Sequence, residues 1–171
     1  MDATRRVLLK SAGALVLAPA LAAPVAVSDR QNREKESRMR FRPLITLRLA
    51  TGATEEVGVT PRGTLSIFPI TGGSFDGDRL RGRVLAGGGD WVTAKSDGTM
   101  EVDLRVTLET EDGALIYVTF SGVRDDLHQY FRTLPLFQTA APQYAFLNRL
   151  LAVGIGEIRD GTPVHTIEEI L

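Results

Sequence analysis

Residues 70–116 read ITGGSFDGDRLRGRVLAGGGDWVTAKSDGTMEVDLRVTLETEDGALI, and this stretch decides the fold class. Apolar residues alternate with polar ones within it, most clearly from Met100 to Glu109. An alternation of period two is typical of strands with one apolar and one polar face. The dipeptides Asp97-Gly98 and Asp112-Gly113 tolerate the positive φ angles of tight hairpin turns. The stretch is therefore predicted to be an antiparallel meander.

The composition extends this prediction to a single all-β domain. The chain has 171 residues, of which 43% are hydrophobic, enough for one domain with a real core. Its 17 glycines and 8 prolines are spread between short apolar segments, a pattern typical of many turns between short strands. Roughly seven to nine such strands must protect their edges, and closure of the sheet removes the edges. We predict a small closed antiparallel β-barrel, with a two-sheet sandwich as the alternative.

One segment departs from the strand pattern. Residues 140–151 read AAPQYAFLNRLL, and Pro142 stands where the first turn of a helix accepts proline. Tyr144 and Asn148 are four residues apart and would share one face of that helix. We expect a short helix that covers one end of the barrel. Asn148 either contributes to a ligand site or ties the helix to a neighbouring loop.

The N-terminus resembles an export signal. Residues 4–10, TRRVLLK, resemble the twin-arginine motif, and the alanine-rich run SAGALVLAPALAA follows them. This run is too short to span a bilayer, which needs about 20 apolar residues. We expect a twin-arginine-like signal peptide over residues 1–28, the export machinery as its partner, no stable membrane span, and a periplasmic or secreted protein. A general-secretory signal is the alternative. Residues 29–40 are expected to be a polar disordered linker and residues 41–171 the barrel domain.

Charge and residue counts exclude several kinds of site. The formal net charge of -1 provides no field to attract nucleic acid. The absence of cysteine excludes disulfides, thiolate metal sites and cysteine nucleophiles. His128 and His165 are the only histidines and are far apart in sequence, so neither a metal site nor a histidine triad is expected. His165 is expected to be a surface imidazole, and no motif identifies a cofactor.

The candidate site consists of polar and aromatic residues on the predicted strands and helix. Asp103 and Arg105 are two residues apart, lie on one strand face, and can together bind an anionic or hydroxylated ligand. Asp90 stands at a strand entry, and an aspartate shielded from water has a raised pKa and can transfer protons. The candidate catalytic residues are Asp90, Asp103 and Arg105, and the candidate ligand-binding residues are Trp91, Tyr117, Tyr144 and Asn148.

The alternation alone does not say which strand face lies inside the barrel. If the face with Asp103 and Arg105 points inward, the lumen holds a polar binding site. If it points outward, the same residues form solvated cross-strand charge pairs, each worth a fraction of a kcal/mol. We expect the arginines of residues 79–83 outside, because burying three of them is costly, and we expect Asp90, Trp91 and Arg105 inside. Trp91 is then either a core residue or a wall of the pocket.

Several segments resemble a known protein family. They are ITGGSFDGDRLRGRVLAGGGDW, DGTMEVDLRVTLETEDGALIYV, YFRTLPLF and PQYAFLNRLLAVGIGE, and together they are similar to the uncharacterised family called domain of unknown function 3237, or uncharacterised protein family 0311. The resemblance covers roughly residues 41 to 171. It implies a β-barrel and no settled activity. Members of that family usually lack an export signal and carry tryptophan where this chain has Phe146, which removes an indole N–H donor.

Three kinds of function remain open at this point. The first is an exported barrel that binds a small organic ligand, which the shortage of catalytic residues favours. The second is an enzyme of the lyase, isomerase or cyclase kind, in which Asp90 or Asp103 transfers a proton and Arg105 holds the developing anion. The third is a structural or partner-binding module without an enclosed site.

Overall fold

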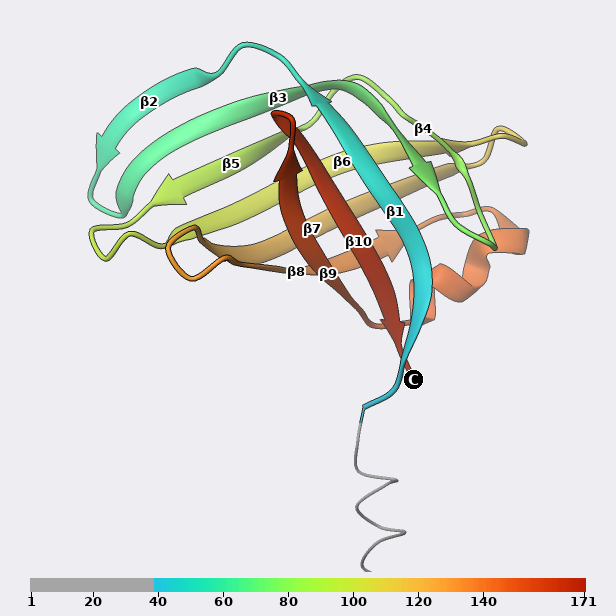
Figure 1. Cartoon of the computed structure of the whole chain (residues 1–171). Coiled ribbons are helices and arrows are strands. Elements are labelled where there is room, and N and C mark those ends of the chain that lie inside the picture. The colour runs from blue at the N-terminus through green and yellow to red at the C-terminus, as the bar shows by residue number, and fades with distance from the viewer. Residues whose placement is uncertain (1–38) are drawn as a thin grey trace, which may run out of the picture. The chain divides into compact units, whose positions relative to one another are not determined.

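The computed structural model describes residues 39–171, so the signal peptide and most of the linker expected within residues 1–40 lie outside the described residues. The described part is antiparallel β-structure with one short helix (Figure 1). Its elements in chain order are β1 (Phe41–Thr51), β2 (Glu55–Thr60), β3 (Gly63–Asp76), β4 (Gly82–Val84), β5 (Gly89–Ala94), β6 (Met100–Thr110), β7 (Leu115–Asp125), β8 (Tyr130–Gln138), the 3₁₀ helix η1 (Pro142–Arg149), β9 (Ala152–Arg159) and β10 (Thr162–Ile170).

These strands close into a barrel. From β1 the neighbours run through β10, β9, β8 and β7 to β6, all antiparallel. Both β4 and β5 lie between β6 and β3, and β3 pairs back with β1. The circuit therefore has eight places, because β4 and β5 share one and β2 adds to the outer edge of β3. This confirms the predicted closed barrel and rules out the alternative two-sheet sandwich.

Strand β3 links the two halves of this circuit. Its first half, up to Pro69, pairs with β2 and β5, and its second half, from Ile70, pairs with β1 and β4. Proline lacks a backbone N–H, so Pro69 fits the point where the strand changes partners. The carbonyl of Pro69 still accepts a hydrogen bond from the N–H of Gly52, at 2.8 Å.

Tight turns fix the register of the meander. Gly98 and Gly113 have φ angles of 87° and 82°, in the left-handed region that favours glycine. They join β5 to β6 and β6 to β7, as the two Asp-Gly dipeptides predict. A third such turn joins β9 to β10, where Asp160 and Gly161 both have positive φ.

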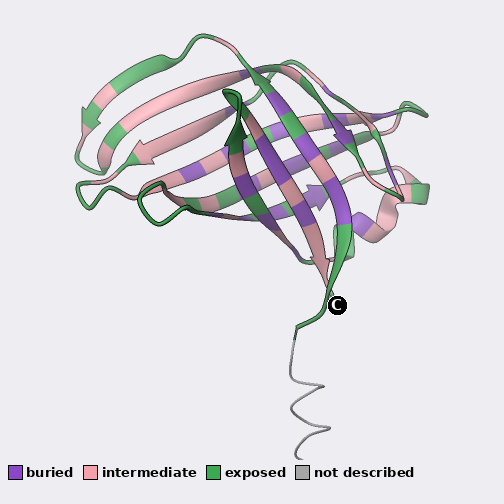
Figure 2. Cartoon of the chain, viewed as in Figure 1, coloured by how far each residue is buried: buried purple, intermediate pink, exposed green. Residues whose placement is uncertain are grey.

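The barrel interior is filled with aliphatic and phenylalanine side chains. Along most strands buried and exposed residues alternate, so one face of each strand forms the core (Figure 2). Leu47, Leu108, Ile116 and Val118 are wholly buried there. On η1, Leu147 is buried in the same core, which confirms the short helix that the sequence predicts at one end of the barrel.

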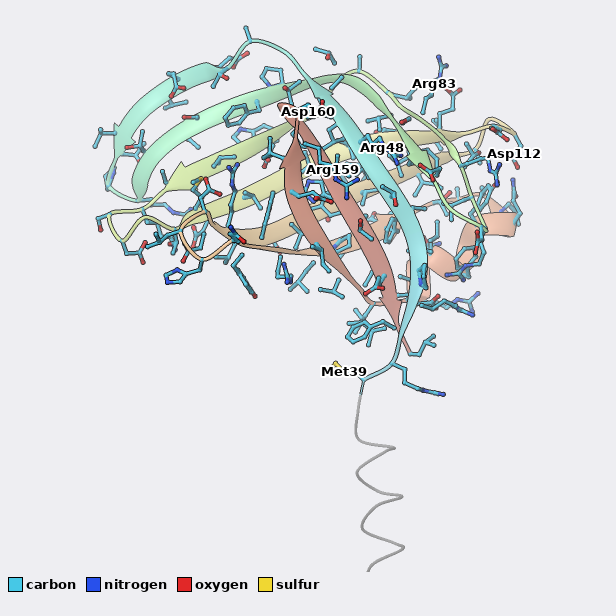
Figure 3. The ribbon with its side chains drawn as sticks, in the orientation of Figure 1. Met39, Arg48, Arg83, Asp112, Arg159 and Asp160 are labelled. Carbon is cyan, nitrogen blue, oxygen red and sulfur yellow. The ribbon has the colours of Figure 1, made fainter. Side chains whose placement is uncertain are left out.

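The outside of the barrel is charged. Arg48 pairs with Asp76, Arg83 with Glu109 and Arg159 with Glu157, and Figure 3 labels the three arginines on the surface of the ribbon. Such exposed pairs are each worth about 0 to 1 kcal/mol. These pairs make the outer surface hydrophilic and contribute little to the stability of the fold.

Candidate functional site

The alternation along β6 assigns the candidate residues to the two faces of the barrel wall. Val102, Leu104 and Val106 are buried in the interior, so Asp103 and Arg105 between them point outward. Residues directly opposite on neighbouring strands share a face. Trp91 is opposite Asp103 and therefore also lies outside, whereas Asp90 is opposite Leu104 and lies inside. The expectation that Asp90, Trp91 and Arg105 all face the interior is therefore met by Asp90 alone.

The outer face of this wall carries a groove of about 1410 Å³. Strands β2, β3 and β5 to β9 contribute to it. Four of the candidate residues line it together, namely Trp91, Asp103, Arg105 and Tyr117. The structure therefore brings most of the predicted polar set into one concavity, but on the outside of the barrel and not in its lumen.

Trp91 forms one wall of this groove. Its neighbour two residues back, Gly89, has no side chain, and a Cβ there would lie 3.5 Å from Cη2 of the indole. The ring therefore lies along the strand in van der Waals contact with the Gly89 position. The guanidinium carbon of Arg105 lies 5.7 Å from the centre of the indole, within the range of a cation–π interaction. The indole is held between the strand and the guanidinium.

Arg105 is already paired with an acid. Its Nη2 donates to Oδ2 of Asp103 at 3.0 Å and its Nε donates to Oδ1 at 3.3 Å. Both side chains are about half exposed. The predicted Arg–carboxylate pair therefore exists, but as a solvated pair in which the two charges largely neutralise each other.

Arg132, on β8, also lines the groove, and like Arg62 it was not among the residues predicted from the sequence. Its Nη1 donates to the carbonyl of Phe131 at 3.0 Å, and its guanidinium carbon lies 5.0 Å from the centre of the Tyr130 ring. No carboxylate of residues 39–171 forms an ion pair with it, whereas Arg62 pairs with Glu101 in the same groove. Three arginines and two carboxylates line the groove, which leaves one net positive charge, and Arg132 is the arginine among them without a carboxylate partner in residues 39–171.

Apolar side chains surround this charge. Leu134 and Leu136, on the outward face of β8, are 59% and 52% exposed, and Val123 on β7 is 44% exposed. Outward positions of a barrel in water are usually polar. An apolar surface beside an unpaired guanidinium is suited to a ligand with an acidic group and a hydrophobic body.

On the other side of the wall, Asp90 is partly buried among the inner side chains. Burial, with a contribution from the charge of Asp103, raises the pKa of its carboxyl to about 6, against smaller lowering effects of a hydrogen bond from the Asp103 backbone and of the charge of Arg124. Its Oδ1 atom is buried and has no hydrogen-bond partner among the described residues. Asp90 therefore has the raised pKa that the sequence analysis expected of a shielded aspartate.

Tyr144 and Asn148 do not join the groove. The amide of Asn148 donates to the carbonyl of Thr139 and accepts from its N–H, both at 2.8 Å, which ties η1 to the preceding loop. The hydroxyl of Tyr144 donates to Oδ1 of Asp112 at 3.2 Å. Asp112, labelled in Figure 3, lies in the turn between β6 and β7. Loss of hydration and the neighbouring Asp112 raise the pKa of Tyr144. The two residues fasten one end of the barrel.

His165 corrects another expectation. It is 3% exposed, with its ring stacked on Phe120 at 5.4 Å between centroids and edge-on to Phe131 at 5.2 Å. It is therefore a core residue and not a surface imidazole. Burial lowers its pKa to about 4, so the ring is neutral at physiological pH.

Two further features are absent from residues 39–171. No group of three or more histidine or acidic side chains is placed to hold a metal ion within this range. Nor does any helix of the described part have the length and apolar character to cross a membrane.

Comparison with known proteins places these features in a family. A family model described as "Protein of unknown function (DUF3237)" matches residues 39–126. A UPF0311 protein of Rhodopseudomonas palustris is 31% identical over 144 residues, which span 75% of this chain and 94% of that protein. A solved β-barrel-like protein from Acinetobacter baumannii is 32% identical, with a TM-score of 0.74 over 78% of this chain and 97% of the other. A solved protein of unknown function from R. palustris is 27% identical, with a TM-score of 0.73 over 78% of this chain and 99% of its own.

Proposed function

Because the chain belongs to the DUF3237 family, whose description assigns no activity, we propose a function from the site itself: the outer groove binds a small organic acid with an aromatic or other apolar body. The observation that carries this proposal is Arg132, a guanidinium without a carboxylate partner in the described chain, set among exposed apolar side chains. Of the two other arginines of the groove, Arg105 is paired with Asp103, and the exposed Arg62 shares Glu101 with Lys95.

The chemistry of the groove sets the class of ligand. A guanidinium binds a carboxylate through two parallel hydrogen bonds, and such charge-assisted bonds are about twice as strong as neutral ones. The Tyr130 ring holds the Arg132 side chain from one side. Leu134 and the Trp91 indole supply apolar and aromatic surface for the body of the ligand. An acid without an apolar body would use only half of this site.

A calorimetric titration with 2-naphthoate and its uncharged amide tests the proposal. We expect the acid to bind and the amide to bind at least tenfold more weakly. Arg132→Gln should weaken acid binding by about 10- to 100-fold, since a hydrogen bond to a charged group is worth about 1.5–3 kcal/mol. The matched control is Arg83→Gln, which removes an exposed arginine paired with Glu109 outside the groove.

Two results would contradict this function. Equal affinity for the acid and the amide would show that the positive charge of Arg132 does not select the ligand. A stable oligomer that buries Leu134 and Leu136 and binds neither probe would assign the apolar face to a second copy of the chain. That outcome corresponds to the partner-binding module left open by the sequence.

We also infer that the protein reaches this ligand outside the cytoplasm, in the periplasm or medium. The support is the twin-arginine-like motif of residues 4–10 and the apolar run after it. Fractionation of cells that express the full chain tests this. Wild type should appear in the exported fraction, and the double substitution Arg5→Lys and Arg6→Lys should retain it in the cytoplasm. Export of both forms alike would favour the general-secretory alternative.

A further inference from the structure

The floor of the groove carries a serine hydroxyl that the chain itself leaves unpaired. Ser121 lies on β7, lines the groove and is exposed. Other hydroxyls in residues 39–171 donate to oxygens of the chain, such as Thr60 to the carbonyl of Gly63 and Thr139 to that of Leu115, both at 2.7 Å. The Ser121 hydroxyl forms no hydrogen bond with any of residues 39–171. A serine hydroxyl can donate one hydrogen bond and accept two, so Ser121 can bind a ligand.

The strand register places Ser121 between the polar and the apolar side of the groove. On β6 it is opposite Asp103, and on β8 it is opposite Leu134. Asp103 is in turn opposite Trp91 on β5. Neighbouring strands are about 4.8 Å apart, so these four residues form a row about 14 Å long across the outer face. A flat ligand that lies between Leu134 and Trp91 therefore passes over Ser121 and Asp103.

Asp103 can accept a further hydrogen bond beside Ser121. Its two carboxylate oxygens each accept one hydrogen bond from Arg105, at 3.0 and 3.3 Å. A carboxylate has about four acceptor positions, so about two remain. Side chains directly opposite each other on neighbouring strands have Cβ atoms about 4.5–5.5 Å apart. Ser121 and Asp103 can therefore hold one hydroxyl group of a ligand together, with the serine as donor and the carboxylate as acceptor.

The neighbouring hydroxyl on the same strand face has different surroundings. Thr119 is opposite Arg105 on β6 and Leu136 on β8. A guanidinium has no acceptor to offer a ligand hydroxyl. Ser121 is therefore the hydroxyl of the β7 floor that stands directly opposite a carboxylate.

The Arg132 guanidinium lies at the other end of the groove floor from this pair. Arg132 is opposite Val123, which is two residues from Ser121 along β7. Its guanidinium is directed along β8 toward Tyr130, because it lies 5.0 Å from that ring and donates to the carbonyl of Phe131. With a rise of about 3.3 Å per residue and about 4.8 Å between strands, the guanidinium and Ser121 are about 10 Å apart.

This spacing limits where a ligand can carry its two polar groups. A hydrogen bond takes up about 3 Å at each end, so at least about 4 Å must separate the acidic group of the ligand from its hydroxyl. Adjacent carbons of an aromatic ring bring the two groups closer than this. The carboxylate and the hydroxyl must therefore stand at opposite ends of the aromatic body, which then lies against Val123 and Leu134.

We propose that the groove selects aromatic acids that carry a hydroxyl at the end remote from the carboxylate, and that Ser121 and Asp103 recognise this hydroxyl. This inference rests on the function proposed for the groove, because Arg132 has to hold the carboxylate. It adds a second recognition element to that function and names the class of ligand more closely. Arg132 binds one end of the ligand, and the pair of Ser121 and Asp103 binds the other.

Titration calorimetry at pH 7 with three acids tests the inference. The probes are 2-naphthoate, 6-hydroxy-2-naphthoate and its positional isomer 3-hydroxy-2-naphthoate. The 6-hydroxy acid should bind wild type about tenfold more tightly than 2-naphthoate, the effect expected of one hydrogen bond to a charged group. The 3-hydroxy acid carries its hydroxyl beside the carboxylate and should show no such gain.

Two substitutions assign this preference to residues. Ser121→Ala and Asp103→Asn should each reduce the tenfold preference to about threefold or less. Asp103→Asn also removes the partner of Arg105 and changes the affinity for every acid, but the preference is a ratio of two affinities in one protein, so this shared change cancels. The matched control is Ser74→Ala, an exposed serine of β3 outside the groove, which should keep the full preference.

The outcomes separate this inference from the function on which it rests. Equal affinity of wild type for 2-naphthoate and its 6-hydroxy derivative would overturn the inference and leave the function of the groove in place. A preference that survives in both Ser121→Ala and Asp103→Asn would also overturn it, because the hydroxyl would then be recognised elsewhere. Binding of none of the three acids would overturn the function proposed for the groove, and this inference with it.

Discussion

Replacing Asp90 by asparagine should stabilise the protein at neutral pH. The wild-type carboxylate is ionised at pH 7, although it is partly buried and its Oδ1 has no partner in the described chain. A rise in pKa from 3.8 to about 6 corresponds to about 3 kcal/mol for a fully shielded group. Asp90 is only partly buried, so solvent screens its charge, and we expect about half of this, roughly 1–2 kcal/mol.

The sign of this effect depends on pH. The pKa of Asp90 is higher in the folded state than in the unfolded state, so its contribution to stability is complete below about pH 4 and is lost as the pH rises through about 6. Asparagine does not titrate. The free energy of unfolding of Asp90→Asn should therefore match that of wild type near pH 4 and exceed it by roughly 1–2 kcal/mol near pH 7.

Urea unfolding followed by circular dichroism measures this difference at several pH values. Groups that the two proteins share, including His165, titrate alike in both. Their contributions therefore cancel when the free energy of unfolding of wild type is subtracted from that of the variant. A free-energy difference that does not grow with pH would refute the reasoning, because burial of the charge would then not be the cause. An asparagine variant that is less stable at pH 7 would show that the Asp90 carboxylate is satisfied in the fold.

Three further predictions concern the interior and the helix. The pKa of His165 is lower in the folded state than in the unfolded state, so the free energy of unfolding should fall by about 3 kcal/mol as the pH drops from about 6.5 to 4. Urea unfolding should show this fall in wild type and not in His165→Leu. Gly154→Ala should destabilise the fold by roughly 1–3 kcal/mol because its Cβ overlaps with Thr133, and Thr133→Ala in the same chain should recover most of that loss in thermal unfolding. Asn148→Ala should lower the free energy of unfolding by about 1–3 kcal/mol, because it removes two hydrogen bonds to Thr139. Calorimetry should find the affinity for 2-naphthoate unchanged in this variant. Weaker binding would show that η1 contributes to the groove.

Local signals explain why the barrel could be predicted. The alternation along β6 and the Asp-Gly turns around it are properties of a few adjacent residues, so they are visible without the rest of the chain. Strand β2 has no such local signal, because Gly58, Pro61 and Gly63 in and beside it are residues typical of a turn. It is a strand because β3 extends past the barrel and offers it an edge. That edge exists only in the assembled sheet.

The faces of the strands were harder to predict. Asp90 and Trp91 are consecutive in a strand, so they must point to opposite sides, and they cannot both have lined the lumen with Arg105. The sequence could have revealed this conflict. It could not reveal that the outward residues line a groove, because this depends on how β2, β3 and β5 to β9 curve together.

Two polar residues of the inner strand faces, His165 and Thr133, were not predicted to be buried. His165 was expected at the surface, but Gly156 on the neighbouring strand leaves room for Phe131 to pack against it. Thr133 was missed, although the alternation of Phe131, Thr133 and Phe137 along β8 was a usable signal. What placed these side chains together is the pairing of β8, β9 and β10, which no local pattern encodes.

A crystal structure of the protein with 2-naphthoate would test the central claim most directly. Our account predicts the carboxylate within hydrogen-bond distance of the Arg132 guanidinium and the naphthyl ring against Leu134 or Trp91, on the outside of the barrel. The acid bound elsewhere, or the groove covered by a second copy of the chain with no ligand in it, would contradict the account.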